Sequence, residues 1–161
     1  MAPRDSEVAI IPSVLDRLID LEPRQTREAS RSHAVSLREM KAAIRRDVEW
    51  LLNSRAFIDA EKLGLEEAKN SVAVFGLPDI TGVGAENLDE RKNLTSALEQ
   101  AIRVFEPRFL NPRITMEPPT STDRALKFRI ETLLDVGSAP QPLVFHTVLQ
   151  LGSAHFALRQ I

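Results

Sequence analysis

Cysteine is absent from all 161 residues, which excludes a disulfide framework and any thiolate metal site. This composition suits a reducing compartment. No apolar run approaches the ~20 residues of a membrane-spanning helix. The opening residues, MAPRDSEVAII, lack the apolar core and the small-residue cleavage site of a secretory signal. We therefore predict a soluble, cytoplasmic chain without direct membrane insertion.

A basic excess is also missing. The chain has 21 lysines and arginines against 23 acidic residues, a net charge of −2 at pH 7. Domains that bind nucleic acid usually carry an excess of positive charge to neutralise phosphates, so we predict no nucleic-acid partner. The hydrophobic share of 43% and the charged share of 27% are ordinary for a globular protein.

Motifs for cofactors, metals and covalent catalysis are lacking too. The glycines at residues 76–84 do not have the spacing of a phosphate-binding loop, and neither GxSxG nor HExxH occurs. The three histidines, His33, His146 and His155, are too scattered to indicate a metal site. We predict no metal and no cofactor.

Amphipathic helices are expected in the first two thirds of the chain. Ser36 and Glu39 form a capping box at the start of a long apolar stripe with helical spacing. Trp50 lies beside this stripe and is predicted to be a core residue. A second long helix is expected to begin at Asn87 and to end at Phe105.

Shorter segments complete this half of the chain. A short helix near residues 13–20 is followed by a polar stretch at 22–35, which has no apolar period and indicates a linker. We therefore expect an N-terminal segment, 1–35, and a single domain, 36–161. A short helix is also predicted over residues 65–75.

The apolar residues change from helical to alternating spacing after residue 109. Strands are expected at 114–117, 128–136 and 143–151, with a further segment around Phe156. Helices followed by strands predict an α+β fold, in which N-terminal helices pack on a small, mainly antiparallel C-terminal β-sheet.

The strand at 143–151 is expected to form a free edge of this sheet, because few strands are available to flank it. It contains neither lysine nor proline, the residues that usually blunt an edge. We predict that another chain adds a strand here. The contacting residues would be Val144, His146, Thr147 and Val148.

The segment Glu106-Pro107-Arg108 lies between two phenylalanines where the second long helix ends. A carboxylate there faces the negative end of the helix dipole, and Pro107 prevents the helix from continuing. Glu106 therefore needs a cation, from Arg108, Arg103 or another molecule. The sequence leaves open whether this is an internal ion pair or a contact with a partner.

Glycoside hydrolysis is the enzymatic alternative. It requires two carboxyl groups roughly 5–9.5 Å apart, one of them protonated. The helix end and the phenylalanines would favour a protonated Glu106, but the sequence fixes no second acid beside it. Glu99 lies two turns back on the same helix, and Glu117 lies on a strand. Arg108 would keep Glu106 ionised, so we predict no enzymatic activity and no catalytic residue.

Several segments, in order along the chain, resemble those of one family. They are SVLDRLID at 13–20, RRDVEWLLNSR at 45–55, SVAVFGLPDITG at 71–82 and FEPRF at 105–109, followed by the strand pair containing FRIETLLDV and VFHTVLQL. On these segments the chain resembles the TssE family, the small baseplate proteins of bacterial type VI secretion systems. The baseplate-wedge and sheath-initiator proteins of contractile phage tails are relatives of this family.

The resemblance implies a structural part rather than an enzyme. Such a part joins wedge subunits and templates the contractile sheath, in the cytoplasm but assembled on a membrane-anchored secretion complex. The implied partners are the wedge proteins TssF, TssG and TssK and the sheath proteins TssB and TssC. In the family the Glu-Pro-Arg segment contacts wedge subunits, which carries over to Glu106, Pro107 and Arg108.

Two alternatives stay open beside this reading. One is a lysozyme-like peptidoglycan hydrolase that uses Glu106 as its acid. The other is a free-standing adaptor that binds a different protein, because one fold can serve several partners.

Overall fold

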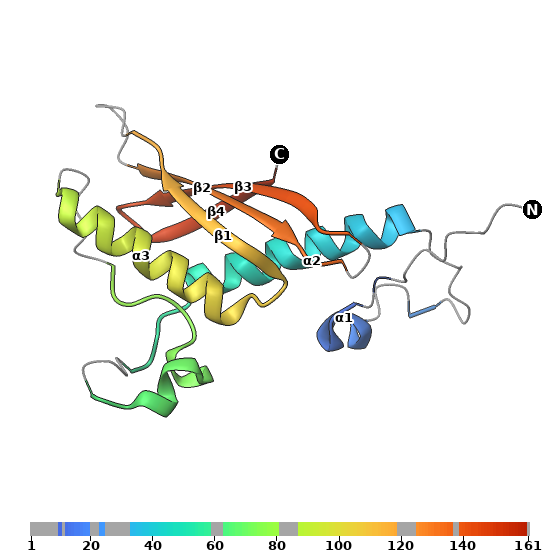
Figure 1. Cartoon of the computed structure of the whole chain (residues 1–161), viewed down its shortest axis with the longest axis horizontal. Coiled ribbons are helices and arrows are strands. Elements are labelled where there is room, and N and C mark those ends of the chain that lie inside the picture. Colours follow the sequence, from blue (N-terminus) through green and yellow to red (C-terminus); the bar gives the residue numbers. More distant parts are fainter. Residues whose placement is uncertain are drawn as a thin grey trace, which may run out of the picture.

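Helices precede strands along the chain, so the α+β arrangement is confirmed (Figure 1). The computed structural model describes residues 10, 12–19, 23–24, 33–58, 63–80, 87–118, 125–136 and 139–160. The elements are α1 (Val14–Leu18), α2 (His33–Asn53), the 3₁₀ helices η1 (Glu66–Asn70) and η2 (Val72–Val74), α3 (Leu88–Phe105), β1 (Phe109–Met116), β2 (Ala125–Leu134), β3 (Gln141–Gln150) and β4 (His155–Gln160).

Helix α2 begins at His33, three residues before the predicted start. Ser36 and Glu39 therefore lie inside the helix, and their prediction as a capping box is wrong. A serine followed three residues later by a glutamate can also occur within a helix, so this pair does not by itself mark a helix start. Most of the predicted linker at 22–35 lies outside the described residues. The division of the chain at residue 35 stays a prediction, although α2 runs across it.

The buried stripe of α2 consists of Ile44, Val48, Leu51 and Leu52. Trp50 lies off this stripe, and 63% of it is exposed, so the prediction of a core tryptophan is wrong. A side chain next to an apolar stripe is buried only where another element covers that side of the helix.

Helix α3 starts and ends as predicted. The Asn87 side chain accepts hydrogen bonds from the backbone N–H groups of Asp89 and Glu90, at 3.0 and 3.3 Å. These bonds satisfy donors that the first helical turn leaves without partners. The last helical residue is Phe105, and the buried stripe ends one turn earlier at Ile102.

The four strands form one antiparallel sheet in the order β1-β2-β3-β4. Side chains alternate along β2: Phe128, Ile130 and Leu134 are buried, whereas Arg129 and Leu133 are exposed. The buried face of the sheet and the apolar stripes of α2 and α3 form a single core. At its centre lie three fully buried phenylalanines, Phe128, Phe145 and Phe156.

Strand β1 is longer than predicted, because it begins immediately after the corner at Phe109. The register with β2 shifts between Leu110 and Arg113, and Asn111 takes a φ of 53° within this bulge. Pro112 lies in the same bulge. A proline has no backbone N–H to donate to a neighbouring strand. It is tolerated here because β1 is an edge strand and because residues in a bulge are left partly unpaired.

The predicted edge strand is an inner strand. β3 pairs along its whole length with β2, and from Phe145 to Gln150 it also pairs with β4. The edge prediction for this strand is therefore wrong. The physical reason is that the last segment of the chain, around Phe156, forms a full strand and covers the other side of β3. The edges of the sheet are β1 and β4.

The segment between α2 and α3 is not the helix predicted over residues 65–75. It forms η1 and η2, separated by extended backbone at Ser71, whose side chain accepts a hydrogen bond from Ala73 N–H. Figure 1 shows this green segment away from the sheet. Its far end is attached to the residues just after α2 by two backbone hydrogen bonds of 2.9 Å each. The Leu77 carbonyl accepts the N–H of Ala56, and the Leu77 N–H donates to the carbonyl of Ser54.

Candidate functional site

The Glu-Pro-Arg corner joins α3 to β1. Glu106 is the last residue whose N–H bonds into the helix, to the Ile102 carbonyl at 2.9 Å, and its own carbonyl accepts the N–H of Phe109 at 3.1 Å. The Arg108 carbonyl accepts the N–H of Asp135 at 2.9 Å, which extends the β1–β2 ladder to the corner. The backbone of this corner is therefore fixed from both sides.

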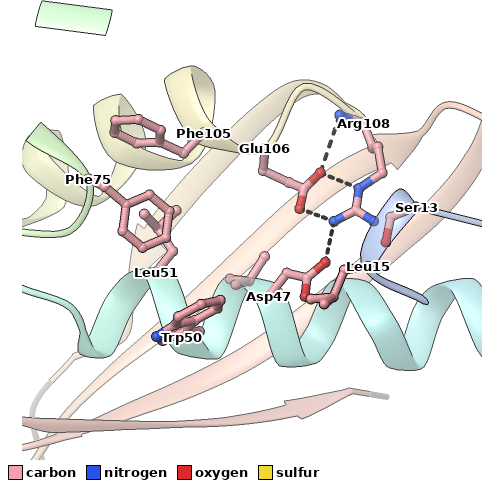
Figure 2. A pocket seen from close by; sticks show the side chains of 10 residues that line it. Ser13, Leu15, Asp47, Trp50, Leu51, Phe75, Phe105, Glu106 and Arg108 are labelled. Carbon is pink, nitrogen blue, oxygen red and sulfur yellow. Dashed lines mark hydrogen bonds and ion pairs between the residues drawn. The ribbon is translucent and has the colours of Figure 1, made fainter. Parts of the chain in front are cut away.

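Glu106 and Arg108 form an internal ion pair (Figure 2). Nε and Nη2 of Arg108 donate to the two carboxylate oxygens of Glu106, at 2.5 and 2.6 Å, and the Arg108 backbone N–H donates to Oε1 at 3.3 Å. Only 3% of Glu106 is exposed. The cation that Glu106 needs is thus Arg108; Arg103 instead pairs with Glu99 at 2.8 Å.

The pair continues into a chain of charges that crosses three elements. Arg108 Nη2 also donates to Asp47 on α2, at 2.9 Å. Asp47 accepts from its neighbour Arg46 at 2.7 Å, and Arg46 reaches Asp16 on α1 at 2.9 Å. Two arginines therefore lie between three carboxylates, and the chain of contacts ties α1 and α2 to the corner.

The surroundings shift the pKa values of Arg108 and Asp16, each toward its charged form. Burial lowers the pKa of the Arg108 guanidinium, but the hydrogen bonds and charges of Glu106 and then Asp47 outweigh it and raise that pKa above its ordinary value. Burial raises the pKa of Asp16, but Ser13 and Arg46 outweigh it and lower that pKa. Each charged form is therefore stabilised by its neighbours.

A cavity of about 300 Å³ opens beside the corner. Figure 2 shows Phe75, Phe105 and Trp50 on one side of it and the ion pair on the other. Trp50 meets the edge of Phe75 with ring centroids 6.1 Å apart, and Phe75 meets Phe105 at 5.2 Å. We call these three side chains the aromatic wall.

The sequence alone did not identify Asp47 or the aromatic wall as parts of this site. Both Asp47 and Trp50 fall within RRDVEWLLNSR, and the resemblance was the only signal that singled out this run. Phe75 reaches Phe105 across 30 positions of sequence, a contact that no periodic pattern indicates.

The four residues predicted on β3 do not share one face. Thr147 points into the core, and its hydroxyl has no hydrogen-bond partner among the described residues. Val144, His146 and Val148 alternate with it and lie on the outer face, half-buried. There His146 Nδ1 lies 3.3 Å from Glu117 Oε1.

The two edges of the sheet differ in their accessibility. On β4, the Asn53 side chain accepts the N–H of Phe156 and donates to its carbonyl, at 2.9 Å each, and Glu49 accepts the N–H of Leu158 at 3.4 Å. Side chains of α2 thus occupy backbone groups that another strand would use. On β1, no described side chain is hydrogen-bonded to the backbone of Ile114 or Met116.

Hydrolytic chemistry has little support in this geometry. Both carboxylate oxygens of Glu106 accept from Arg108, and the neighbouring acid, Asp47, is bound to the same guanidinium. These donors stabilise the ionised carboxylate, whereas a general acid must be protonated. Within the described part of the chain, no group of three or more His, Asp or Glu residues is arranged to hold a metal, and no helix is long and apolar enough to span a membrane.

Comparison with known proteins identifies the family. The sequence profile described as "Baseplate wedge protein gp25" matches residues 38–138, which include most of α2, all of α3, the Glu-Pro-Arg corner and the first two strands. No curated protein and no solved structure matches this chain. Because the match covers more than half of its residues, the chain belongs to the baseplate wedge protein gp25 family, to which TssE also belongs.

Proposed function

We propose that this chain is the TssE-type baseplate subunit of a type VI secretion system, acting in the cytoplasm as a structural part without enzymatic activity. In this role it joins the wedge proteins TssF, TssG and TssK and templates the sheath of TssB and TssC. Membership of a baseplate wedge family supports the phage-tail-like role. The observation that carries the proposal is the rigid corner beside an open cavity with an aromatic wall.

At the corner, we assign direct contact with a wedge protein to Pro107 and Arg108 and a positioning role to Glu106. Glu106 is covered and fully engaged, whereas Pro107 is exposed. Nη1 of Arg108 has no hydrogen-bond partner among the described residues, which leaves a donor for a carbonyl or carboxylate of another chain. The adjacent cavity would take an apolar side chain from the same partner.

Co-purification of wedge proteins from cells that express the secretion genes tests this assignment. Trp50→Ala removes an exposed aromatic from the cavity and should abolish co-purification while the isolated domain stays folded. Phe57→Ala is the matched control, because Phe57 is also an exposed aromatic but does not line the cavity. Equal recovery of wedge proteins with both variants would contradict the assignment.

The second contact, with the sheath, is a strand added to the sheet, and we place it on β1 rather than β3. Glu117 N–H bonds to the Lys127 carbonyl at 2.8 Å, so in the antiparallel alternation the N–H groups of Thr115 and Arg113 also face β2. The backbone groups of Ile114 and Met116 then face outward, where a partner strand would bind them.

Sheath counts in cells test the β1 edge. Met116→Pro removes one outward N–H without breaking the β1–β2 ladder, and it should prevent sheath formation. Met116→Ala also removes the methionine side chain but keeps the backbone N–H, so sheaths should form in normal numbers. Normal sheath numbers with the proline variant would rule out strand addition at β1. A proline at Thr147 or Val148 is unsuitable, because it would break the sheet at an inner strand.

Peptidoglycan turnover distinguishes the enzymatic alternative. We expect the purified chain to release no soluble fragments from peptidoglycan. If the wild-type chain degrades peptidoglycan and a folded Glu106→Gln variant does not, the proposal of a purely structural role is wrong. Capture of an unrelated protein, without any wedge or sheath subunit, would favour the adaptor alternative.

A further inference from the structure

The outer face of the sheet carries a cluster of basic side chains that the proposed function does not use. This face is opposite the one that packs on the helices, and its side chains alternate with the buried ones along each strand. The basic side chains come from all four strands: the cations Arg113, Lys127, Arg129 and Arg159, and the imidazole of His146. We call these five residues the basic face.

Three members of the basic face lie in one row across the sheet. Arg129 on β2 is directly opposite His146 on β3, and His146 is directly opposite Arg159 on β4. Neighbouring strands are about 4.8 Å apart, so Arg129 and Arg159 lie on the two sides of His146, about two strand spacings from each other. The row therefore places two arginines on one face of the sheet.

Carboxylates on the same face offset the cations only in part. Arg129 pairs with Glu131 at 2.7 Å, and His146 lies beside Glu117. Arg113 and Arg159 are exposed and have no ion-pair or hydrogen-bond partner among the described residues. Asp135 follows the same outward alternation at the end of β2. The four lysines and arginines of the basic face therefore exceed the three carboxylates on it by one charge, on a chain whose total charge is −2.

We propose that the basic face binds an acidic surface of a partner protein, whose carboxylates pair with Arg113 and Arg159. A protein fits better than a nucleic acid for two reasons. Apolar side chains lie among the cations, including Leu133, which is 44% exposed. No Phe or Trp occupies a described outward position on the sheet, although single-stranded nucleic acids are usually bound by stacking on such side chains.

Fluorescence anisotropy with a labelled oligo-glutamate peptide, at low ionic strength and with the full chain, tests this proposal. The variant Arg113→Gln/Arg159→Gln should bind the peptide roughly tenfold more weakly than the wild type, since two charge pairs are lost. The matched control is Arg38→Gln/Arg45→Gln, which removes the same charge from exposed positions on α2. It should bind within about twofold of the wild type.

Three outcomes would overturn the proposal. One is equal weakening in both double variants, which would show a response to net charge alone. Another is a wild-type protein that does not bind the peptide. The third is tighter binding of a single-stranded thymidine oligonucleotide of the same charge, which would make the basic face a nucleic-acid site. Circular dichroism of each variant confirms that the fold is retained. Arg113 lies on β1, but its N–H faces β2, and the substitutions change neither the corner nor the outward backbone groups of Ile114 and Met116. These results are therefore independent of the proposed baseplate role.

Discussion

Glu106 and Arg108 have unequal environments although they form one ion pair. Glu106 is almost completely covered, and within the described part of the chain every hydrogen bond to its carboxylate comes from Arg108. A quarter of the Arg108 side chain is exposed, and it has a second carboxylate partner in Asp47. Removing one partner of a buried pair is costly mainly because of the charge that is left behind. The two truncations should therefore differ.

Arg108→Ala should destabilise the domain by about 3–5 kcal/mol, because it leaves the Glu106 carboxylate buried without a cation. Glu106→Ala should cost less, since Arg108 keeps Asp47 and reaches solvent. Urea denaturation of both variants measures the two free energies of unfolding. A larger loss for Glu106→Ala than for Arg108→Ala would contradict this account of the pair.

Gly76 is required by the backbone at the point where the 3₁₀ segment returns to α2. Its φ is +112°, and a Cβ there would lie 2.6 Å from the backbone carbonyl of Ser54. Gly76→Ala should therefore cost about 2 kcal/mol or more, from both the strained φ and the overlap. Gly152→Ala, where a Cβ meets nothing within 4 Å, is the control and should change stability by less than about 0.5 kcal/mol. Thermal denaturation compares the two, and equal midpoints would refute the argument.

At the scale of elements, α2 does more than supply part of the core. Asp47 on one side of the helix holds Arg108 at the corner. Asn53 and Glu49, toward its C-terminal end, bind the backbone of β4. One helix thus fixes the corner and also closes one of the two sheet edges, a known way to keep an edge from pairing with other chains.

Asn53→Ala should open the β4 edge. It leaves the N–H and carbonyl of Phe156 without their side-chain partners, which should cost about 1–3 kcal/mol. Hydrogen exchange of the Phe156 amide should become faster than in the wild type. The control is Ser54→Ala, because the Ser54 hydroxyl donates to the Trp50 carbonyl of α2 and, among the described residues, has no bond to β4. Unchanged exchange at Phe156 in Asn53→Ala would show that the edge is closed by other contacts.

The attachment of α1 should depend on pH. The pKa of Asp16 lies below its ordinary value of 3.8 when the chain is folded. A carboxylate with a depressed pKa stabilises the folded form at all pH values above its ordinary pKa, and the contribution is lost as the pH falls through the folded-state value. Below pH 3.8 we therefore expect α1 to separate from Arg46 on α2.

Amide exchange in α1, followed as a function of pH, measures this separation. The amides of Arg17 and Ile19, which bond within α1, should lose protection at acidic pH in the wild type. In Asp16→Asn these amides should have little protection from exchange at any pH, since the charge that binds Arg46 is gone. A wild type and variant with the same pH profile would exclude the Asp16–Arg46 contact as the attachment.

For the whole molecule, the proposed contacts lie at opposite ends of β1. The corner precedes Phe109, and the outward backbone groups are those of Ile114 and Met116 near the other end. A strand of 8 residues is roughly 25 Å long. We therefore propose that the two partners bind at once, as a subunit that links the wedge to the sheath requires.

The two contacts should be separable by mutation. Trp50→Ala should lose the wedge proteins but still bind purified sheath protein, whereas Met116→Pro should bind wedge proteins but not sheath. Co-purification with each partner in turn measures this. Loss of both partners in both variants, with the fold intact, would indicate one continuous interface instead of two.

What the sequence by itself determined are the features that depend on nearby residues. The cap at Asn87, the end of α3 before Pro107 and the alternation along β2 all follow from residues a few positions apart, and each was predicted correctly. The Glu106 carboxylate at a helix end also indicated a nearby cation. Arg108, two positions away, supplies it.

Tertiary structure alone decided the features that join distant parts of the chain. The Asp47–Arg108 contact spans 61 positions, and the Asn53–Phe156 contact spans 103. Whether β3 is an edge depends on where β4 pairs, and the exposure of Trp50 depends on which face of α2 the sheet covers. Periodicity shows that a face is apolar, but not which element covers it. That is decided when the helices and the sheet pack into one core.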